Sequence, residues 1–287
     1  MFVTELWQWL VQPLQYEFMV KAIAVSALVG VVCAMLSCYM ILKGWALMGD
    51  AVSHSVLPGV VLSYALGLPY AIGAFVFGLG SVFLIGLIQR QSRIKEDTAI
   101  GLVFTGFFAA GLILVSKTPS SVPLTHILFG NPLGIPNAEL WQTMIASVIT
   151  IMGILLFRKD LMLFCFDPIH AKSIGLPTNF LYYLLLTLLS LTIVAALQTV
   201  GIVLVIAQLI TPAATAYLLC DRFDRMMLIA VIVSLFASIL GTYISFHLNV
   251  STGGTIVVLQ TLLFLSAFIF APKHGLLARH NAPKARL

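Results

Sequence analysis

Charged side chains are scarce in this chain. Of its 287 residues 9% are charged, while 61% are hydrophobic and the mean hydropathy is +1.08. A water-soluble core cannot bury that much apolar surface, so the composition excludes both a soluble globular fold and a disordered chain. The 15 Lys and Arg residues form no basic face interleaved with exposed aromatic residues, which argues against binding to nucleic acid. The composition indicates a polytopic membrane protein.

Cysteines are also few, and the signatures of several enzyme classes are missing. The four cysteines form no C-x-x-C pair and are expected to be packing residues rather than a disulfide framework: Cys33, Cys38, Cys165 and Cys220. The chain contains no G-x-x-x-x-G-K-[ST] phosphate loop, no H-E-x-x-H motif and no G-x-S-x-G motif. It is therefore not expected to be an enzyme, and any ATP hydrolysis that drives it takes place on another chain.

The hydrophobic residues are gathered into nine runs of about 20 residues, which is the length that crosses the core of a bilayer. In lipid the backbone polar groups must bond within their own segment, and no run alternates as a barrel strand does, so the runs are expected to be α-helices. They begin near Phe18, Leu47, Pro69, Lys95, Glu139, Asn179, Val200, Arg225 and Gly253. The sequence predicts an all-α polytopic membrane protein with nine transmembrane helices, or eight if one run is re-entrant.

The distribution of positive charge predicts the orientation. With nine spans and an external N-terminus, thirteen of the fifteen Lys and Arg residues fall inside, so the C-terminus is expected in the cytoplasm. We expect residues 1–17 to form an interfacial N-terminal segment, residues 18–272 the transmembrane domain, and residues 273–287 a basic cytoplasmic tail.

Two ionisable residues stand together inside an apolar run. Asp50 is the one acidic residue of ten that falls within a span, where a carboxylate costs about 2.5 to 3.5 kcal/mol on insertion scales. His54 follows four residues later, so both side chains share one helical face with Cβ atoms about 6 Å apart. A carboxylate and an imidazole at this spacing suit one divalent cation.

This pair has other interpretations. Asp50 can form a structural ion pair with Lys43, seven residues earlier, and His54 can simply bond to a neighbouring helix. As a metal site the pair is incomplete, since Mn²⁺, Fe²⁺ and Zn²⁺ take four to six donors. A symmetric dimer can double the set and water can complete it.

Pro212 lies well inside the run that begins near Val200. A proline there removes a backbone hydrogen bond and kinks or breaks the helix. The kink either exposes backbone carbonyls to a transport pathway or serves packing alone.

The cytoplasmic connection at residues 158–178 contains a short helix. Asp167 and Pro168 have the chemistry of an N-cap and a first helical residue, and Gly175 has that of a stop, which predicts about two turns. The connection is either a solvated linker or a docking helix for a cytosolic partner. Apolar residues that water disfavours support docking: Phe164, Phe166, Ile169 and Ile174.

Five segments in this order resemble the permease subunits of the manganese, iron and zinc branch of the ATP-binding cassette importers, and most closely the manganese and chelated-iron permeases of Gram-negative bacteria. The similarity covers nearly the whole length. The segments are CAMLSCYMILKGWALMGDAVSHSVLPGV at 33–60, RIKEDTAIGLVF at 93–104, FDPIHAKSIGLP at 166–177, ALQTVGIVLVIAQLITPAATAYLL at 196–219 and TGGTIVVLQTLLFLSAFIFAPKHGLLA at 252–278.

The resemblance implies how the protein is assembled. It implies a permease that acts as a dimer, either with an identical chain or with a paralogue, in the bacterial inner membrane. Two cytosolic ATPase subunits bind ATP on the inner side, and a periplasmic or lipoprotein metal-binding protein delivers the ion from outside. Membrane lipid surrounds the helices, and neither a permanently bound cofactor nor a nucleic acid partner is expected.

The resemblance also implies roles for residues. Asp50 and His54 would line the metal path. The helix at about 166–176 would receive the ATPase, which carries the coupling role to Phe166, Asp167, Pro168, His170, Ala171, Gly175 and Leu176. Zinc-specific relatives tend to show a different run after the histidine, so SVLPG at 55–59 favours Mn²⁺ and Fe²⁺ as the transported ions.

Three alternatives remain open. The first is a zinc importer of the same family. The second is a proton-coupled secondary transporter, in which Asp50 and His54 relay protons and metal and no ATPase is needed. The third is a scaffolding membrane protein, which would leave the pair without a role.

Overall fold

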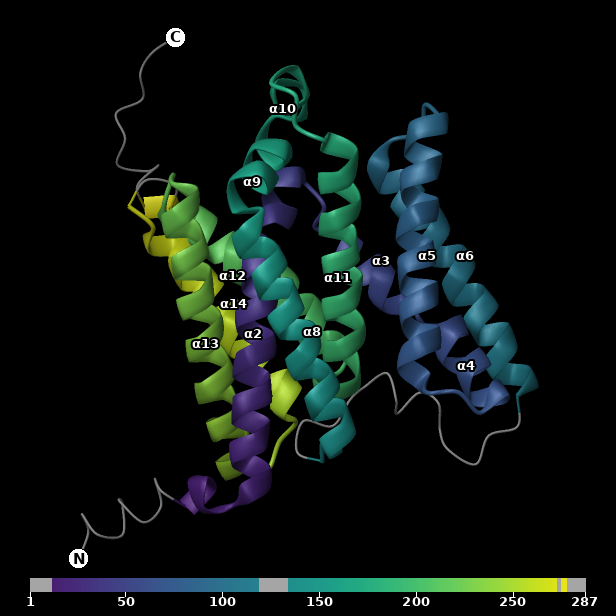
Figure 1. The fold of residues 1–287 in the computed structure, drawn as a ribbon. Coiled ribbons are helices and arrows are strands. Elements are labelled where there is room, and N and C mark those ends of the chain that lie inside the picture. Colours follow the sequence, from purple (N-terminus) through teal and green to yellow (C-terminus); the bar gives the residue numbers. More distant parts are fainter. Residues whose placement is uncertain (1–11, 119–133, 273–274, 278–287) are drawn as a thin grey trace, which may run out of the picture.

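The computed structural model describes residues 12–118, 134–272 and 275–277, and within these ranges the chain is built of helices (Figure 1). The all-α prediction is confirmed. Among the described residues, eight helices are long and apolar enough to cross a membrane. They are α2 (Glu17–Lys43), α5 (Tyr70–Gln91), α6 (Glu96–Lys117), α8 (Asn137–Leu156), α11 (Thr178–Val200), α12 (Ile202–Leu219), α13 (Phe223–Leu248) and α14 (Thr252–Phe270).

The remaining apolar run is not one continuous helix. It consists of α3 (Met48–Ser55) and α4 (Leu57–Leu66), which meet at Val56. Pro58 lies at the start of α4, where a missing backbone N–H costs little. In a continuous helix that N–H would bond to the carbonyl of His54, so the proline and the break occur together.

The two short helices nevertheless follow α11 over most of its length. Trp45, just before α3, makes an edge-to-face contact with Tyr182 near the start of α11, with ring centroids 5.5 Å apart. Leu57 and Val61 of α4 pack in one cluster with Leu197 near the end of α11. Tyr182 and Leu197 are fifteen positions apart in α11, which is a distance of about 22 Å along a helix. Helices α3 and α4 together therefore extend about 22 Å along α11. The run from Leu47 is therefore a broken crossing rather than a re-entrant loop.

The helices form two groups that α11 connects. Helices α2, α12, α13 and α14 pack together, and α4, α5 and α6 pack beside one another on the opposite side (Figure 1). Helix α11 contacts α8 and α2 as well as α5. The last residues of α14 and the connection after α8 lie at the same end of the molecule (Figure 1). We call it the cytoplasmic end, as the charge distribution predicts.

Small residues allow the helices to approach one another closely. A Cβ on Gly59 of α4 would lie 2.1 Å from the carbonyl oxygen of Gly73 in α5. A Cβ on Gly30 of α2 would lie 2.7 Å from the hydroxyl of Ser234 in α13. That hydroxyl donates to Oε1 of Gln208 in α12 at 2.5 Å, so a hydrogen bond joins α12 and α13 at the point where α2 packs closely against them.

Pro212 does not break its helix, because α12 continues on both sides of it. The backbone N–H of Ala213 donates to the hydroxyl of Ser37 in α2 at 3.3 Å. Ser37 is fully buried. The structure thus shows Pro212 at a packed contact between α2 and α12.

The connection at residues 158–178, which is predicted to be cytoplasmic, contains two helices where one was predicted. Helix α10 (Pro168–Ser173) is the expected short helix, and Gly175 after it has the left-handed φ of +86° that the predicted stop requires. Helix α9 (Arg158–Phe166) was not predicted, because its charged first turn looks like the solvated end of a span. The expectation that Phe164 is exposed was wrong, since this ring packs into the core from α9.

The predicted terminal segments lie largely outside the described residues. Of residues 1–17, the structure describes a short 3-10 helix, η1 (Gln12–Gln15), and the first residues that lead into α2. Of residues 273–287, it describes 275–277. The four cysteines all lie in described parts of the chain and are free thiols. Burial raises the pKa of the Cys165 thiol in α9 to about 12, so this thiol stays protonated and does not suit a metal ion.

Candidate functional site

The structure brings Asp50 and His54 together on one face of α3. Nε2 of His54 lies 3.3 Å from Oδ1 of Asp50, and the two side chains are 27% and 40% exposed, respectively. Ligand bonds of about 2.0 to 2.2 Å that meet at 90° to 109° place two donors roughly 2.8 to 3.6 Å apart. One divalent cation can therefore bind both atoms with little rearrangement of the pair.

Other groups near the pair are already occupied or point elsewhere. The hydroxyls of Ser53 and Ser55 donate to backbone carbonyls one turn earlier, at 2.8 and 2.7 Å. Lys43 does not pair with Asp50, because its ammonium lies over the ring of Phe164, 4.5 Å from the centroid. The alternative of a Lys43 ion pair is therefore not seen.

The pair alone does not complete a metal site. Among the described residues, no group of three or more His, Cys, Asp and Glu side chains could hold a metal ion. The break in the helix does not leave a free acceptor beside the pair, because the carbonyl of His54, which Pro58 cannot bond, accepts from the N–H of Val56. Water and a second copy of the chain remain as sources of further donors.

The predicted coupling residues occupy different places on α9 and α10. Phe166 is 79% exposed and His170 and Pro168 are also exposed, whereas Ala171 is fully buried. Asp167 is the N-cap of α10, and its Oδ1 accepts from the N–H of Ile169 at 3.0 Å and from that of His170 at 2.9 Å.

The remaining coupling candidates complete the end of this segment. Gly175 is exposed, and Leu176 packs partly against the core. Ile169 is 82% exposed and belongs with Phe166 on the outer surface. In this structure Ala171 holds α10 against the molecule, while Phe166 and Ile169 are available to a partner.

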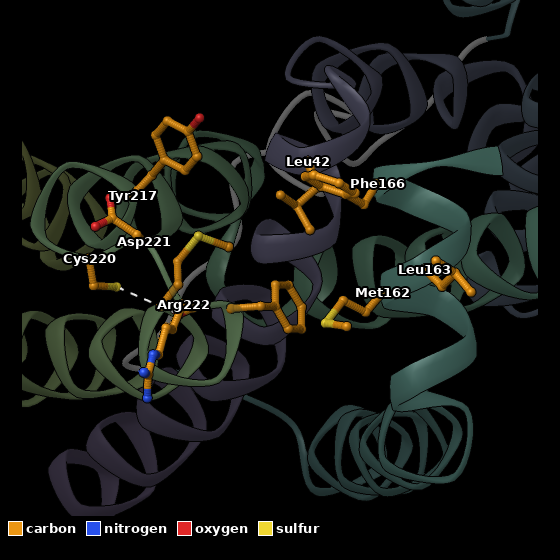
Figure 2. A pocket seen from close by; sticks show the side chains of 10 residues that line it. Leu42, Met162, Leu163, Phe166, Tyr217, Cys220, Asp221 and Arg222 are labelled. Carbon is orange, nitrogen blue, oxygen red and sulfur yellow. Dashed lines mark hydrogen bonds between the residues drawn. The ribbon is translucent and has the colours of Figure 1, made fainter. Parts of the chain in front are cut away.

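A cavity of about 570 Å³ opens beside α9. Figure 2 shows α9 side chains on one side of it and residues from the end of α12 and the turn before α13 on the other. Most of its lining side chains are apolar, and Tyr217, Asp221 and Arg222 add polar groups. The lining residues are Leu42, Met162, Leu163, Phe166, Tyr217, Cys220, Asp221, Arg222, Phe223 and Met226.

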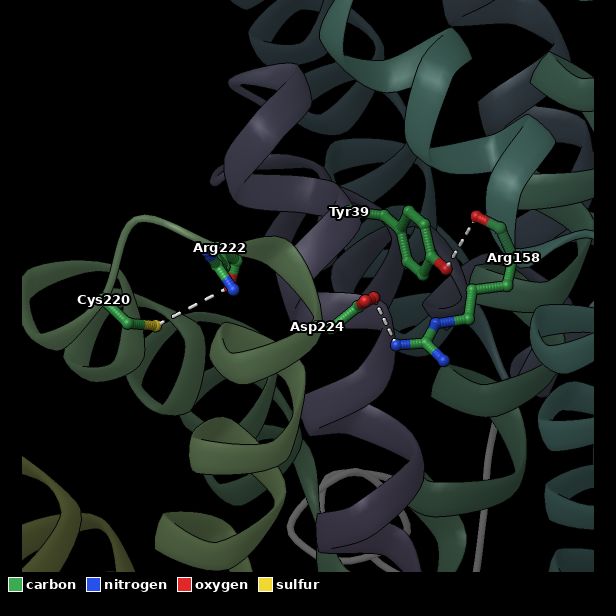
Figure 3. Close-up of polar contacts among 5 residues, drawn as sticks. All are labelled: Tyr39, Arg158, Cys220, Arg222 and Asp224. Carbon is green, nitrogen blue, oxygen red and sulfur yellow. Dashed lines mark hydrogen bonds and ion pairs between the residues drawn. The ribbon is translucent and has the colours of Figure 1, made fainter.

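Three residues join α2, α9 and α13 next to this cavity (Figure 3). Nη2 of Arg158 lies 2.5 Å from Oδ1 of Asp224, and the hydroxyl of Tyr39 donates to the carbonyl of Arg158 at 3.4 Å. The Tyr39 ring packs against Phe223 with centroids 5.0 Å apart. Sequence reasoning missed these contacts, because they join three segments that are far apart along the chain.

The comparison with a family model decides the relationship. The model described as the ABC 3 transport family matches residues 15–271, nearly the whole chain. The chain belongs to the ABC 3 transport family. It is the membrane permease type of subunit and not the ATPase, as the absence of a phosphate loop predicted.

Curated members of the ABC 3 family resemble the chain over almost its full length. The manganese transport system membrane protein MntB of Synechocystis is 62% identical over 273 residues, which cover 95% of this chain and 89% of that protein. The chelated iron transport system membrane protein YfeD of Yersinia pestis is 52% identical over 272 residues, covering 95% and 92% of the two chains.

Solved structures agree with the fold of this ABC 3 permease. A chain of PsaBC from Streptococcus pneumoniae in complex with Fab superposes with a TM-score of 0.84 at 42% identity, covering 95% of this chain and 99% of that one. An inward-facing metal-chelate type ABC transporter superposes with a TM-score of 0.70 at 16% identity, covering 86% and 84%. The second match supports the fold alone.

Proposed function

We propose that this chain is the membrane permease of an ATP-driven bacterial importer that carries Mn²⁺, and also Fe²⁺, into the cytoplasm. The observation that carries the proposal is the Asp50 and His54 pair, whose donor atoms are 3.3 Å apart on a helix inside the membrane domain. The relatives named as manganese and chelated-iron transport proteins support the choice of metals. The permease domain would comprise residues 18–272, between an interfacial segment and a basic cytoplasmic tail.

Asp50 and His54 would have different roles in the path of the ion. Ionised Asp50 supplies oxygen coordination and offsets charge, while neutral His54 supplies nitrogen. Two protein donors hold an ion weakly, and a transport site must release its ion as readily as it binds it. A second permease chain, identical or paralogous, would contribute a further pair, and water would complete the shell.

The energy would come from two ATPase subunits on the cytoplasmic side. The exposed Phe166, Ile169 and Ile174 support docking at the α9–α10 connection, since several large apolar side chains exposed on one short segment are typical of a protein interaction site. ATP binding and hydrolysis would then shift α10 and alternate the access of the path. A periplasmic or lipoprotein metal-binding protein would deliver the ion at the other end, and the bacterial inner membrane is the expected location.

Zinc is the second candidate cargo. Zn²⁺ binds most nitrogen and oxygen sites more tightly than Mn²⁺ does, and the 3.3 Å separation of the donors also suits a tetrahedral ion. Selectivity for Mn²⁺ would then reside largely in the binding protein that delivers the ion.

The test is metal content in manganese-starved cells that express the full transporter and receive Mn²⁺, Fe²⁺ and Zn²⁺ in equal amounts. We expect cells with the original chain to gain manganese and iron and cells with Asp50→Ala to gain neither. The control Ser55→Ala should support the same gain as the original chain, because the Ser55 hydroxyl donates to the carbonyl of Ala51 in the same helix. If the cells gain only zinc, the chain belongs to a zinc importer. If cells with Asp50→Ala gain as much metal as those with the original chain, Asp50 does not bind the transported ion. Uptake without the ATPase, abolished by an uncoupler, would establish a proton-coupled transporter instead.

A further inference from the structure

His54 lies against two aromatic rings of a neighbouring helix. The His54 ring centroid is 5.4 Å from that of Phe104 and 5.3 Å from that of Phe108, with interplanar angles of 61° and 81°. Phe104 and Phe108 are one turn apart on α6 and stack on each other at 6.0 Å and 21°. The imidazole therefore meets a continuous aromatic wall edge-on, which is a favourable geometry for aromatic pairs.

The close approach of α6 makes this contact possible. Gly111 of α6 faces Leu57 of α4, and a Cβ on the glycine would lie 2.8 Å from that side chain. Without this glycine the two helices would separate at the level just beyond His54. Gly111 therefore helps to keep α6 close to the broken span.

We propose that Phe104 and Phe108 are positioning residues that hold the imidazole of His54 with Nε2 directed at Asp50. The proposal rests on the metal path proposed above and adds a second helix to it. A histidine side chain has two free dihedral angles, and α3 alone restrains only the first of them through its backbone. The aromatic wall restrains the ring itself, so it keeps the two donors at a separation that one ion can bridge.

The chain provides a matched control for this role. Phe107 is adjacent to Phe108 on the same helix, yet its ring contacts Phe77 of α5 at 6.0 Å and 73°. Replacing Phe107 by leucine makes the same substitution in α6 as Phe104→Leu and Phe108→Leu do. It leaves both aromatic contacts of His54 in place.

The experiment measures equilibrium binding of Mn²⁺ to the purified permease–ATPase complex, from the electron paramagnetic resonance signal of free Mn²⁺. Removing either ring of the wall should weaken binding between about twofold and twelvefold. We expect this weakening for Phe104→Leu and for Phe108→Leu, original affinity for Phe107→Leu, and recovery for Phe108→Tyr, which keeps the ring. Thermal unfolding midpoints close to that of the Phe107→Leu complex would show that the variants fold.

Two results would overturn the inference in distinguishable ways. If Phe104→Leu and Phe108→Leu bind Mn²⁺ as Phe107→Leu does while Asp50→Ala does not bind it, the wall has no positioning role and the metal path stands. If Asp50→Ala binds Mn²⁺ as tightly as the original chain, the path itself is wrong and the role of the wall falls with it.

Discussion

Gly59 of α4 and Gly73 of α5 face each other so closely that a Cβ on either one would lie 2.1 Å from the carbonyl oxygen of the other. No side chain can move aside here, because the obstacle is backbone. This contact fixes how α4, the second half of the broken span, packs against α5. The broken span also carries the proposed metal ligands, so the contact bears on the site as well as on the fold.

Gly59→Ala should therefore destabilise the protein strongly. Overpacking costs about 1 to 3 kcal/mol, and more where backbone must move, although alanine is the better helix former by about 1 kcal/mol. Gly80→Ala in α5 is the control, since a Cβ at Gly80 meets nothing within 4 Å. Thermal unfolding of the purified variants in detergent should show a lower midpoint for Gly59→Ala only. Equal midpoints would mean that α4 and α5 are further apart than the structure shows.

The N-cap of α10 gives a second prediction. Asp167→Ala removes the acceptor for two backbone N–H groups and should cost about 0.5 to 2 kcal/mol of local helix stability. Binding of the ATPase and metal uptake should fall, while binding of Mn²⁺ to the permease stays unchanged. Asp167→Asn keeps the acceptor and should retain most activity. If the asparagine variant loses as much uptake as the alanine variant, the charge of Asp167 matters rather than its cap.

The exposed apolar side chains of the α9–α10 connection give a third prediction. Replacing both Phe166 and Ile169 by serine should weaken binding of the purified ATPase at least about tenfold, because buried apolar anchors commonly contribute more than 1 kcal/mol each. The fold should not change, since the two side chains are 79% and 82% exposed. Leu248→Ser, at the opposite end of α13 and 64% exposed, is the control. ATPase affinity that survives the double change would place the docking surface elsewhere.

The contacts around Arg158 give a fourth prediction, which ranks two substitutions. Asp224→Ala removes an ion pair whose side chains are 37% and 77% exposed, and such pairs contribute about 0 to 1 kcal/mol. Tyr39→Ala removes a fully buried ring that packs on Phe223, which should cost about 3 kcal/mol or more. The midpoint of thermal unfolding should thus fall far more for Tyr39→Ala. The reverse order would show that the ion pair is the main connection between α9 and α13.

Several features could be predicted from the sequence because they depend on residues close together in the chain. The i, i+4 spacing of Asp50 and His54 places them on one face in any helix. The Asp167-Pro168 start and the Gly175 stop define α10 through bonds within a few residues. The apolar run from Leu47 was predicted as one span, whereas the structure divides it into α3 and α4 next to Pro58, whose missing N–H is a local feature of the sequence.

Other features could not be predicted, because they depend on which segments meet. Helix α9 was missed since its charged start gives no sign that Phe164 would be buried against α2. Nothing in the spacing of Phe104 and Phe108 indicates that His54 would lie against them. The burial of Ala171, to which the resemblance gives a coupling role, likewise depends on how α10 packs against the rest of the chain.

By itself the sequence determined that this is a helical membrane protein with a carboxylate and an imidazole one helical turn apart in a span, because hydrophobic run length and helical period act locally. The resemblance of five segments, and not these patterns, pointed to the permease family. Only the tertiary structure decided how the two halves of this span pack, with α3 in contact with α5, α6 and α11 and with α4 lying against α5 and α6. It also decided that Lys43 lies over Phe164 rather than beside Asp50, and that α6 forms a wall behind His54. These outcomes depend on contacts between helices that are more than forty residues apart in the chain. Close packing at glycines favours particular contacts of this kind, and no local sequence pattern predicts them.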